Sequence, residues 1–133
     1  MKRLLLLPLA MTWLGLLLVS ADETPLQKSV NRGKEVYKTH CQLCHGEKGE
    51  GIEGVYPPIA KADFIKDWKK AIQSIVNGLK GPLTVNGKAY DSEMEPMAQL
   101  NDQQVADVMN FIYNNWGNKG RFVLPEEVKG LRK

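Results

Sequence analysis

The chain has 133 residues, which is one domain's worth of sequence, and its 18 basic and 15 acidic residues give a net charge of +3. Charged residues make up 25% and hydrophobic residues 43%, proportions that are ordinary for a globular protein. Like charges form no blocks, so the composition gives no support to a nucleic-acid partner.

The first 21 residues differ from the rest. Met1–Arg3 is basic, and Leu4–Val19 is an almost wholly apolar run of 16 residues before the small residues Ser20 and Ala21. This order is typical of a secretory signal peptide cut after Ala21. The run is short for a bilayer span of about 20 residues, which favours cleavage over retention as an anchor. We predict export to the periplasm or to the outer face of the cytoplasmic membrane, with membrane association only if residues 1–21 are retained.

Removing this segment takes away two basic residues and leaves 16 basic against 15 acidic residues. The remaining domain is close to neutral, which predicts only modest electrostatic steering of its partners. Its core is small, so a large buried prosthetic group would help it to fold.

Apolar periodicity predicts the first helix from Ser29, after a flexible lead-in at residues 22–28. Ser29 is a candidate N-cap, and Gly33, Tyr37 and Cys41 fall on one face of the helix. Glycine on this face costs the helix about 1 kcal/mol relative to alanine. We therefore expect Gly33 to allow close contact with another helix.

Glycine and proline mark residues 46–58 as a loop. A second helix is predicted at residues 64–77, with Gly78 as its C-terminal stop. Residues 83–90 predict a small hairpin with an Asn-Gly pair at the turn. The segment that follows is expected to be irregular, because Pro96 disfavours helix there.

The last helix is predicted to begin after Asn101, a candidate N-cap with Gln104 at the capping-box position, and to end at Gly117. Residues 118–133 form a C-terminal extension that we expect to pack along the surface. Its apolar anchors would be Phe122, Val123 and Leu124. These elements predict an all-α domain at residues 29–117, with three main helices and a minor hairpin. The loops are long for so short a chain, which suggests that the helices enclose something.

Both cysteines and both histidines of the chain lie within His40–His45. Four interpretations compete for this stretch. A Cys-x-x-Cys disulfide closes too small a loop to constrain the unfolded chain. A thioredoxin-like dithiol needs strands that alternate with helices, which the pattern does not predict. Four zinc ligands on one contiguous segment would struggle to surround a tetrahedral ion.

The fourth interpretation is covalent haem, because Cys-x-x-Cys-His is the attachment signature of c-type haem. Cys41 and Cys44 would form thioethers with the two vinyl groups of the porphyrin, and His45 would be the proximal ligand of the iron. His40 has no part in this scheme and is expected at the surface. Because the chain is predicted to be exported and has no other cysteine, we favour one haem c, with its iron, over the other interpretations.

The haem interpretation requires a search for a sixth iron ligand. Iron held by His45 alone could bind small ligands, whereas a methionine in the sixth position makes an electron carrier with a raised potential. Met109 lies on the apolar face of the last helix, where core packing is expected. Met94 and Met97, both in the irregular segment 91–100, remain as candidate ligands.

These features resemble class I cytochromes c over about residues 29–117. The pair Gly33 and Tyr37 is similar to the family's N-terminal helix, in which the glycine lets the C-terminal helix cross closely beside an aromatic residue. Phe111 is the best counterpart of that aromatic residue. The sequence NWGN at 115–118 resembles the helix ending of small bacterial members, including cytochrome c subunits and domains of larger redox enzymes. The resemblance implies the cytochrome c fold, an all-α fold around one covalent haem.

The resemblance also extends to the candidate iron ligand. Family members carry the axial methionine in a segment of the form Tyr…Met-Pro-Pro…Leu, and residues 90–100 are similar to it. This similarity implies that Met94 is the ligand. Glu95 stands where proline is common, so Met97 remains the alternative.

The family comparison further implies a partner for the proximal histidine. A proline carbonyl commonly accepts its ring N–H and orients it; Pro57 fits this role, with Pro58 as the alternative. Candidate walls of the haem pocket, each of which would otherwise be an ordinary core residue, are Tyr56, Ile59, Trp68, Ile72, Ile75 and Trp116.

The function implied by the resemblance is that of a periplasmic monohaem cytochrome c, which carries single electrons between transient redox protein partners. Such a protein is not expected to be an enzyme by itself, nor to take a small-molecule substrate. Two alternatives stay open. One is a haem c subunit of a larger oxidoreductase, with residues 118–133 as a docking segment. The other is a ligand-binding haem sensor with an open sixth position.

Overall fold

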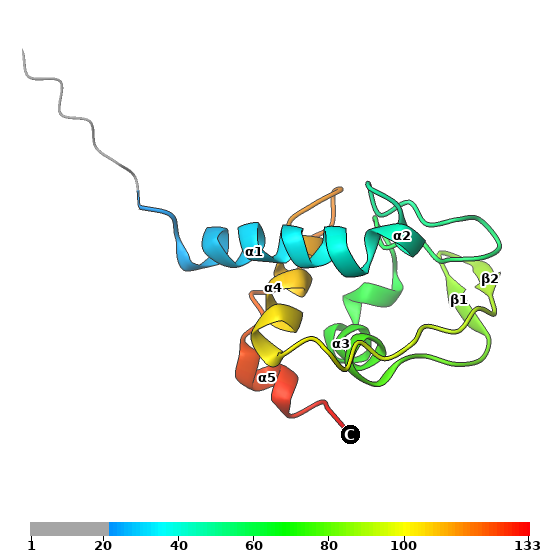
Figure 1. The fold of residues 1–133 in the computed structure, drawn as a ribbon. Helices are drawn as coiled ribbons and strands as arrows, with labels where there is room; N and C mark the ends of the chain where they lie inside the picture. The colour runs from blue at the N-terminus through cyan, green and yellow to red at the C-terminus, as the bar shows by residue number, and fades with distance from the viewer. Residues whose placement is uncertain (1–21) are drawn as a thin grey trace, which may run out of the picture.

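The computed structural model describes residues 22–133, and the signal-peptide prediction for residues 1–21 lies outside this range. In chain order the elements are α1 (Pro25–His40), α2 (Gln42–His45), η1 (Phe64–Lys66), α3 (Trp68–Asn77), β1 (Leu83–Val85), β2 (Lys88–Tyr90), α4 (Asp102–Tyr113) and α5 (Pro125–Lys129). Figure 1 shows α4 crossing beneath α1, with α5 beside α4 and with α3 and the hairpin toward the other end of the molecule. The prediction of a mainly helical domain with one small hairpin is confirmed.

The first helix begins earlier than the sequence pattern indicates. Thr24 is its N-cap, because the Thr24 hydroxyl accepts a hydrogen bond from the backbone N–H of Gln27 (3.2 Å) and proline follows at the first helical position. Pro25–Lys28, expected to be part of a flexible lead-in, therefore form the first turn of α1. The prediction that Ser29 caps the helix is wrong. Ser29 is buried and donates its hydroxyl hydrogen to Asp107 in α4 (2.6 Å).

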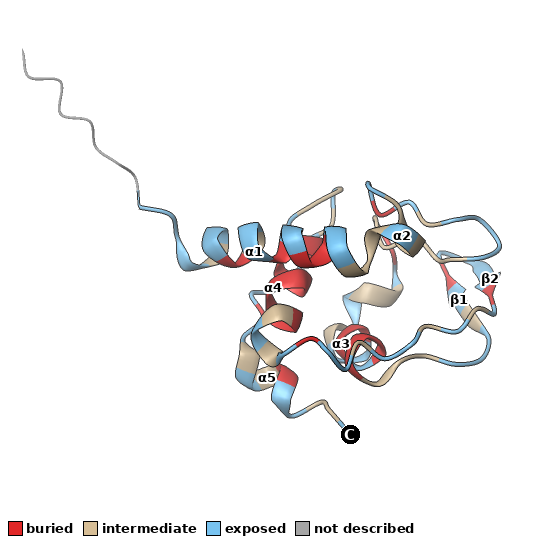
Figure 2. Cartoon of the chain, viewed as in Figure 1, coloured by how far each residue is buried: buried red, intermediate tan, exposed pale blue. Residues whose placement is uncertain are grey.

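The crossing of α1 and α4 is as close as the glycine on α1 predicts. A Cβ atom on Gly33 would lie 2.0 Å from the backbone oxygen of Asp107 and 2.9 Å from Cβ of Phe111. The buried Asp107 carboxylate also accepts two hydrogen bonds from the Arg32 guanidinium, both at 2.7 Å, and one from Gln103 at 2.9 Å. The expected close helix contact at Gly33 beside Phe111 is thus confirmed, and Figure 2 shows the buried residues gathered where α1, α3 and α4 face one another.

Replacing Gly33 with alanine is expected to lower the free energy of unfolding by about 1–3 kcal/mol, the usual cost of overpacking a core. This expected loss of stability is opposite to the effect of helix propensity, which on its own would favour alanine by about 1 kcal/mol. Denaturant unfolding would measure the change. Lys34→Ala, on the exposed face of the same helix, serves as the control and should shift stability by less than about 0.5 kcal/mol. A Gly33→Ala protein as stable as the parent would contradict the close crossing.

The predicted second helix is divided into two. η1 ends at Lys66, and Asp67 adopts an extended conformation and accepts the backbone N–H of Lys70 (3.2 Å) as the N-cap of α3. This local cap competes with a continuous helix and divides it before Trp68. The predicted stop is correct, because α3 ends at Asn77 and Gly78 follows with φ +74.

The predicted start of α4 is confirmed, and its predicted end is wrong. Asn101 and Gln104 form the complete capping box. The helix ends at Tyr113, four residues before Gly117, because the Asn114 and Asn115 side chains donate hydrogen bonds to carbonyls of the last turn.

Residues 118–133 pack on α4 as part of the same domain. Val123 is buried, and the Asn110 side chain both donates to its carbonyl oxygen (2.9 Å) and accepts from its N–H (2.8 Å). Val128 of α5 is also fully buried. Of the predicted anchors only Val123 is correct, since Phe122 and Leu124 are exposed. Helix α5 was not predicted, because it buries a single apolar residue and so has little apolar periodicity.

The hairpin is confirmed with its predicted turn. Leu83 pairs with Tyr90 and Val85 with Lys88. Asn86 and Gly87 both have positive φ, 51° and 77°, which is the geometry of a two-residue turn that matches the twist of the strands.

Candidate functional site

The Cys-x-x-Cys-His motif spans the junction of α1 and α2. Cys41 follows the last residue of α1, its N–H donating to the carbonyl oxygen of Tyr37 (2.9 Å), and α2 carries Cys44 and His45 on a single turn. The two thiols are thus three residues apart, one on the residue that joins α1 to α2 and the other within α2. Leu43, between them, is 93% exposed and takes no part in the interior.

The geometry disfavours the other interpretations of the motif. Both thiols are free. Burial, with a smaller contribution from Cys44, raises the pKa of the Cys41 thiol to about 12, whereas a catalytic dithiol needs a lowered pKa. Within residues 22–133 no three His, Cys, Asp or Glu side chains come together as ligands for one metal ion, which gives the zinc interpretation no support.

His45 is held in one orientation by a backbone carbonyl. Its Nδ1 lies 2.9 Å from the oxygen of Pro57, and because a carbonyl can only accept, Nδ1 carries the proton and Nε2 keeps its lone pair. Burial lowers the pKa of His45 and outweighs the opposing effect of this hydrogen bond. The imidazole is therefore neutral and suited to bind a metal through Nε2. The carbonyl belongs to Pro57 and not to Pro58.

The loop that supplies Pro57 is fixed to the motif at several points. The Tyr37 hydroxyl donates to the carbonyl oxygen of Gly46 (2.7 Å), directly after His45, and the N–H of Gly51 donates to the carbonyl oxygen of His45 (2.8 Å). Lys88 of the hairpin also forms an ion pair with Glu53 of the loop. These contacts position the Pro57 carbonyl beside the imidazole.

An apolar cavity of about 340 Å³ opens beside the motif. Cys41, Cys44 and His45 line one part of it, and both candidate methionines, Met94 and Met97, also line it. Of the predicted wall residues, Tyr56, Ile59 and Ile75 line it, and the prolines considered as partners of His45, Pro57 and Pro58, line it as well. Wall residues that the sequence analysis missed include Phe64, Ile65, Leu79, Leu83, Val85 and Tyr90. The alternation of Leu83 and Val85 in the predicted hairpin was a usable signal for a buried strand face.

Three predicted wall residues lie elsewhere. Trp116 packs against Tyr37 and Phe111, with ring centroids 5.0 and 5.3 Å away, behind the α1–α4 crossing. The guanidinium of Arg121 lies over the ring of Trp68, 4.6 Å from the ring centroid. Ile72 is fully buried in the core. None of the three is among the residues that line the cavity, and a contact of these residues with haem stays a prediction.

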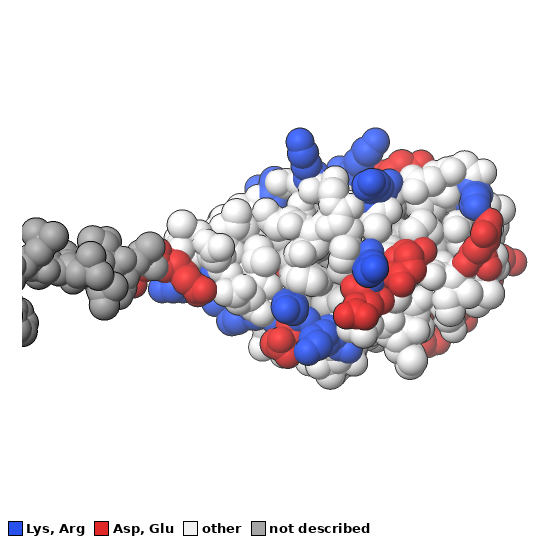
Figure 3. All heavy atoms as spheres, turned by 90° about the horizontal axis from the view of Figure 1, so that it is seen from above, with Lys and Arg blue, Asp and Glu red and all other residues white. Residues whose placement is uncertain are grey.

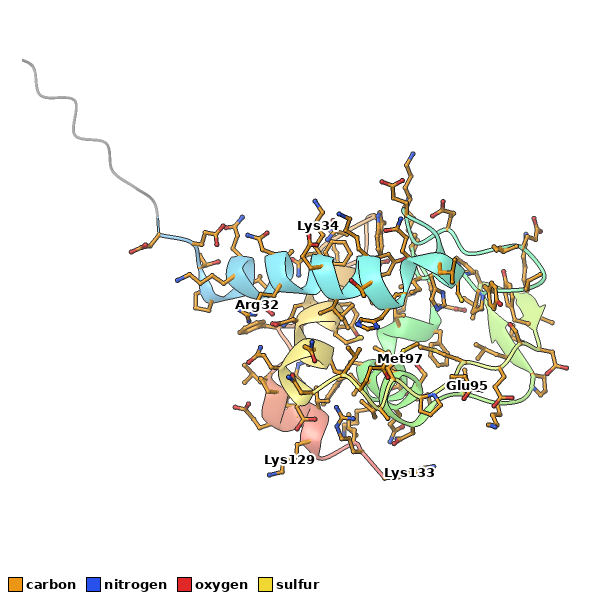
Figure 4. All side chains as sticks on the ribbon, viewed as in Figure 1. Arg32, Lys34, Glu95, Met97, Lys129 and Lys133 are labelled. Atoms are coloured by element: carbon orange, nitrogen blue, oxygen red, sulfur yellow. The ribbon has the colours of Figure 1, made fainter. Side chains whose placement is uncertain are left out.

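The two methionines belong to a segment that we call the methionine loop, residues 91–100, whose labelled members Glu95 and Met97 are seen in Figure 4. Met94 exchanges both backbone hydrogen bonds with Leu79, each at 2.9 Å. A Cβ atom on Gly78 would lie 2.7 Å from the carbonyl oxygen of Met94, so the loop rests directly on the end of α3. Met97 is held through its N–H to Ile75 (2.8 Å), and its sulfur accepts a hydrogen bond from Gln99 (3.4 Å).

The residues around the cavity fit the prosthetic group that the motif predicts. Cys41 and Cys44, the oriented neutral imidazole of His45, and three methionines, Met94, Met97 and Met109, line one apolar cavity. A volume of about 340 Å³ is in the range of small-molecule and cofactor sites. The donor set of imidazole and thioether suits iron in a porphyrin.

Charges of both signs are interspersed on the face seen from above α1, with uncharged areas between them (Figure 3). Near the site, Lys80 pairs with Glu93 in the same way that Lys88 pairs with Glu53. These pairs neutralise part of the charge around the cavity. No helix within residues 22–133 is long and apolar enough to cross a membrane.

The chain is similar to cytochromes c and to cytochrome c subunits of larger proteins. A family model described as "Cytochrome c" matches residues 30–116. The chain is 34% identical over 128 residues to "Cytochrome c-552" of Thermus thermophilus, covering 89% of this chain and 79% of that protein. It is 34% identical over 91 residues to "Alcohol dehydrogenase (quinone), cytochrome c subunit" of Gluconobacter oxydans, covering 66% of this chain and 19% of that subunit. A "Cbb3-type cytochrome c oxidase subunit" of Cereibacter sphaeroides is 30% identical over 101 residues, covering 71% of this chain and 33% of that subunit.

Proposed function

The chain belongs to the cytochrome c family, and we propose that it is an exported monohaem carrier that passes single electrons between protein partners with His45 and Met94 as iron ligands. Electron transfer through covalently bound haem c is the function and the cofactor of this family. When bound, haem c supplies an iron that alternates between the ferric and ferrous states. The single observation that carries the ligand proposal is the cavity lined by Cys41, Cys44, His45 and Met94.

The proposed roles divide among residues of the chain. Cys41 and Cys44 tether the porphyrin through thioethers, and His45 presents Nε2 to the iron. The Pro57 carbonyl holds the imidazole in orientation and makes it a stronger ligand, since hydrogen bonding at Nδ1 raises the basicity of the other nitrogen. The apolar walls exclude water and disfavour the additional charge of the ferric state, which raises the potential.

Two observations support Met94 over Met97 as the sixth ligand. The Met97 sulfur already accepts a hydrogen bond from Gln99, and the Met97 backbone is tied to Ile75 of α3. Met94 has both of its backbone groups paired with Leu79, which fixes the main chain and leaves the side chain to line the cavity. The family resemblance of residues 90–100 points to the same methionine.

The proposal that the protein is exported is based on residues 1–21 and on the Cys-x-x-Cys-His motif. The basic start, the apolar run and the small residues before Asp22 support a cleaved signal peptide. We propose the periplasm, or the outer face of the cytoplasmic membrane, as the location. By itself the protein is proposed to be a carrier without catalytic activity, and its partners to dock transiently through a small interface.

A second candidate function is that of a haem c subunit in a larger oxidoreductase. The names of the Gluconobacter and Cereibacter relatives, which are subunits, favour it. The proposed docking role of residues 118–133 gains no support, because Val123 and Val128 are buried against this domain's own core. Co-purification of the native protein with a dehydrogenase or an oxidase would favour the subunit.

The proposal is tested on protein exported by a host that attaches haem c. A pyridine haemochrome spectrum should give one haem with two thioether links per chain, and a redox titration should follow a single one-electron transition. Ferrous protein should react only slowly with carbon monoxide, because Met94 occupies the sixth position. Rapid carbon monoxide binding would instead identify a ligand-binding sensor.

A further inference from the structure

The last three residues of the chain, Leu131–Lys133, lie against the end of α3 and the start of α4. The Asn77 side chain donates to the carbonyl oxygen of Leu131 (2.9 Å) and accepts from the N–H of Lys133 (3.0 Å). Asn77 is the last residue of α3 and stands two positions before Leu79. The segment 131–133, called the strap below, is therefore fixed to the helix end on which the methionine loop rests.

The strap is fixed to α4 by the side chain of Arg132. Its Nε donates to the Asp102 carboxylate and a terminal nitrogen donates to the carbonyl oxygen of Leu100, both at 2.6 Å. Leu100 ends the methionine loop, and Asp102 is the first residue of α4. Arg132 is about three-quarters buried, with 28% of its side chain exposed, so water screens these charge-assisted bonds only in part.

The strap thus joins the two points between which the methionine loop is held. On one side Gly78 and Leu79 contact Met94 directly. On the other side Leu100 closes the loop, and its N–H donates to the carbonyl oxygen of Met97 (3.0 Å). A separation of the end of α3 from the start of α4 would therefore pull Met94 away from the cavity.

We propose that the strap, through Arg132 and Asn77, positions the methionine loop and so keeps the Met94 sulfur on the iron. This proposal rests on the proposed ligation by Met94. The strap lies outside residues 30–116, which the family model matches. Arg132 and Asn77 do not line the cavity and act only through the loop.

The test uses Arg132→Gln and the double variant N77A/R132Q in haem-loaded protein. Carbon monoxide binds ferrous iron only while the Met94 sulfur is not bound to it. The association rate of carbon monoxide therefore follows the fraction of molecules in which the methionine loop has moved away from the iron. We expect association to be about tenfold faster in R132Q, and faster still in the double variant, because charge-assisted bonds that hold the closed loop are lost. The ferric methionine–iron charge-transfer band should also fade at a lower temperature than in the parent.

The matched control is Arg32→Gln. It removes two hydrogen bonds from a guanidinium to a carboxylate, as R132Q removes two from Arg132, but its partner Asp107 lies in the middle of α4. Figure 4 shows Arg32 on the side of α1 that faces α4, remote from the labelled Met97. We expect R32Q to lower the thermal unfolding midpoint and to leave carbon monoxide association unchanged.

Two results would overturn the proposal. If R132Q and R32Q change carbon monoxide association equally, the strap contributes only general stability. If the charge-transfer band is already missing from the parent protein, the ligation by Met94 fails and the strap proposal fails with it. The parent spectrum therefore separates a failure of the proposed function from a failure of the strap.

Discussion

Replacing Met94 with alanine is expected to abolish the ferric methionine–iron charge-transfer band and to make the ferrous protein bind carbon monoxide readily. The thioether stabilises ferrous over ferric iron, so its loss should also lower the midpoint potential. A tenfold loss of ferrous preference corresponds to about 60 mV for one electron, and we expect a fall larger than this. Optical spectra and a redox titration would measure both effects.

Met97→Ala is the matched control, because Met97 lies in the same loop and lines the same cavity. Its backbone remains tied to Ile75 through the N–H, whatever the side chain. We expect this variant to keep the band and to change the potential little. If instead Met97→Ala loses the band and Met94→Ala keeps it, Met97 is the ligand. The axial methionine of the family then corresponds to a position three residues further along this chain.

Protein made without haem is expected to lack a fixed tertiary structure. An apolar cavity of about 340 Å³ left without its occupant would cost at most about 8 kcal/mol, the value for a fully enclosed cavity at roughly 24 cal/mol per Å³. The whole free energy of unfolding of a small domain is about 5–15 kcal/mol. The cost of the cavity is thus comparable with the total stability, and collapse or unfolding is expected in its place.

Near-UV circular dichroism and limited proteolysis would measure this effect on two preparations. One is the Cys41→Ser/Cys44→Ser variant purified free of haem, and the other is the parent chain from a host with the attachment machinery. We expect a near-UV spectrum without fine structure and rapid cleavage for the first preparation only. A native-like near-UV spectrum in the haem-free variant would contradict the role of the group as part of the core.

The parts of the fold that sequence predicts well depend on neighbouring residues. The capping box of Asn101 and Gln104 and the turn at Asn86 and Gly87 are complete within a few positions, so the pattern contains all that determines them. The start of α1 was missed because Ser29 is a good N-cap by type. Its hydroxyl instead donates a hydrogen bond to Asp107, 78 residues further along the chain, and no local pattern reveals that contact.

The same distinction holds for the site. The motif Cys41–His45 and the two methionines could be found from residue type and spacing. Pro57 and Pro58 are adjacent, and only the folded loop decides which carbonyl faces His45. For Trp68 and Trp116 the sequence left a pocket wall and an ordinary core position equally open, and in the structure Trp116 packs against Tyr37 and Trp68 lies beside Arg121. Which side of the core an aromatic residue occupies is a tertiary property.

The α1–α4 crossing also determines when the domain can close. Arg32 and Asp107 are 75 residues apart, so this contact forms only once both segments are on the same side of the membrane. In an exported chain Cys41 and Cys44 cross the membrane before α4, so the two thiols lie on an unclosed chain until α4 follows. Thioether formation in that interval would meet accessible thiols, and closure of the crossing would then secure the linkage.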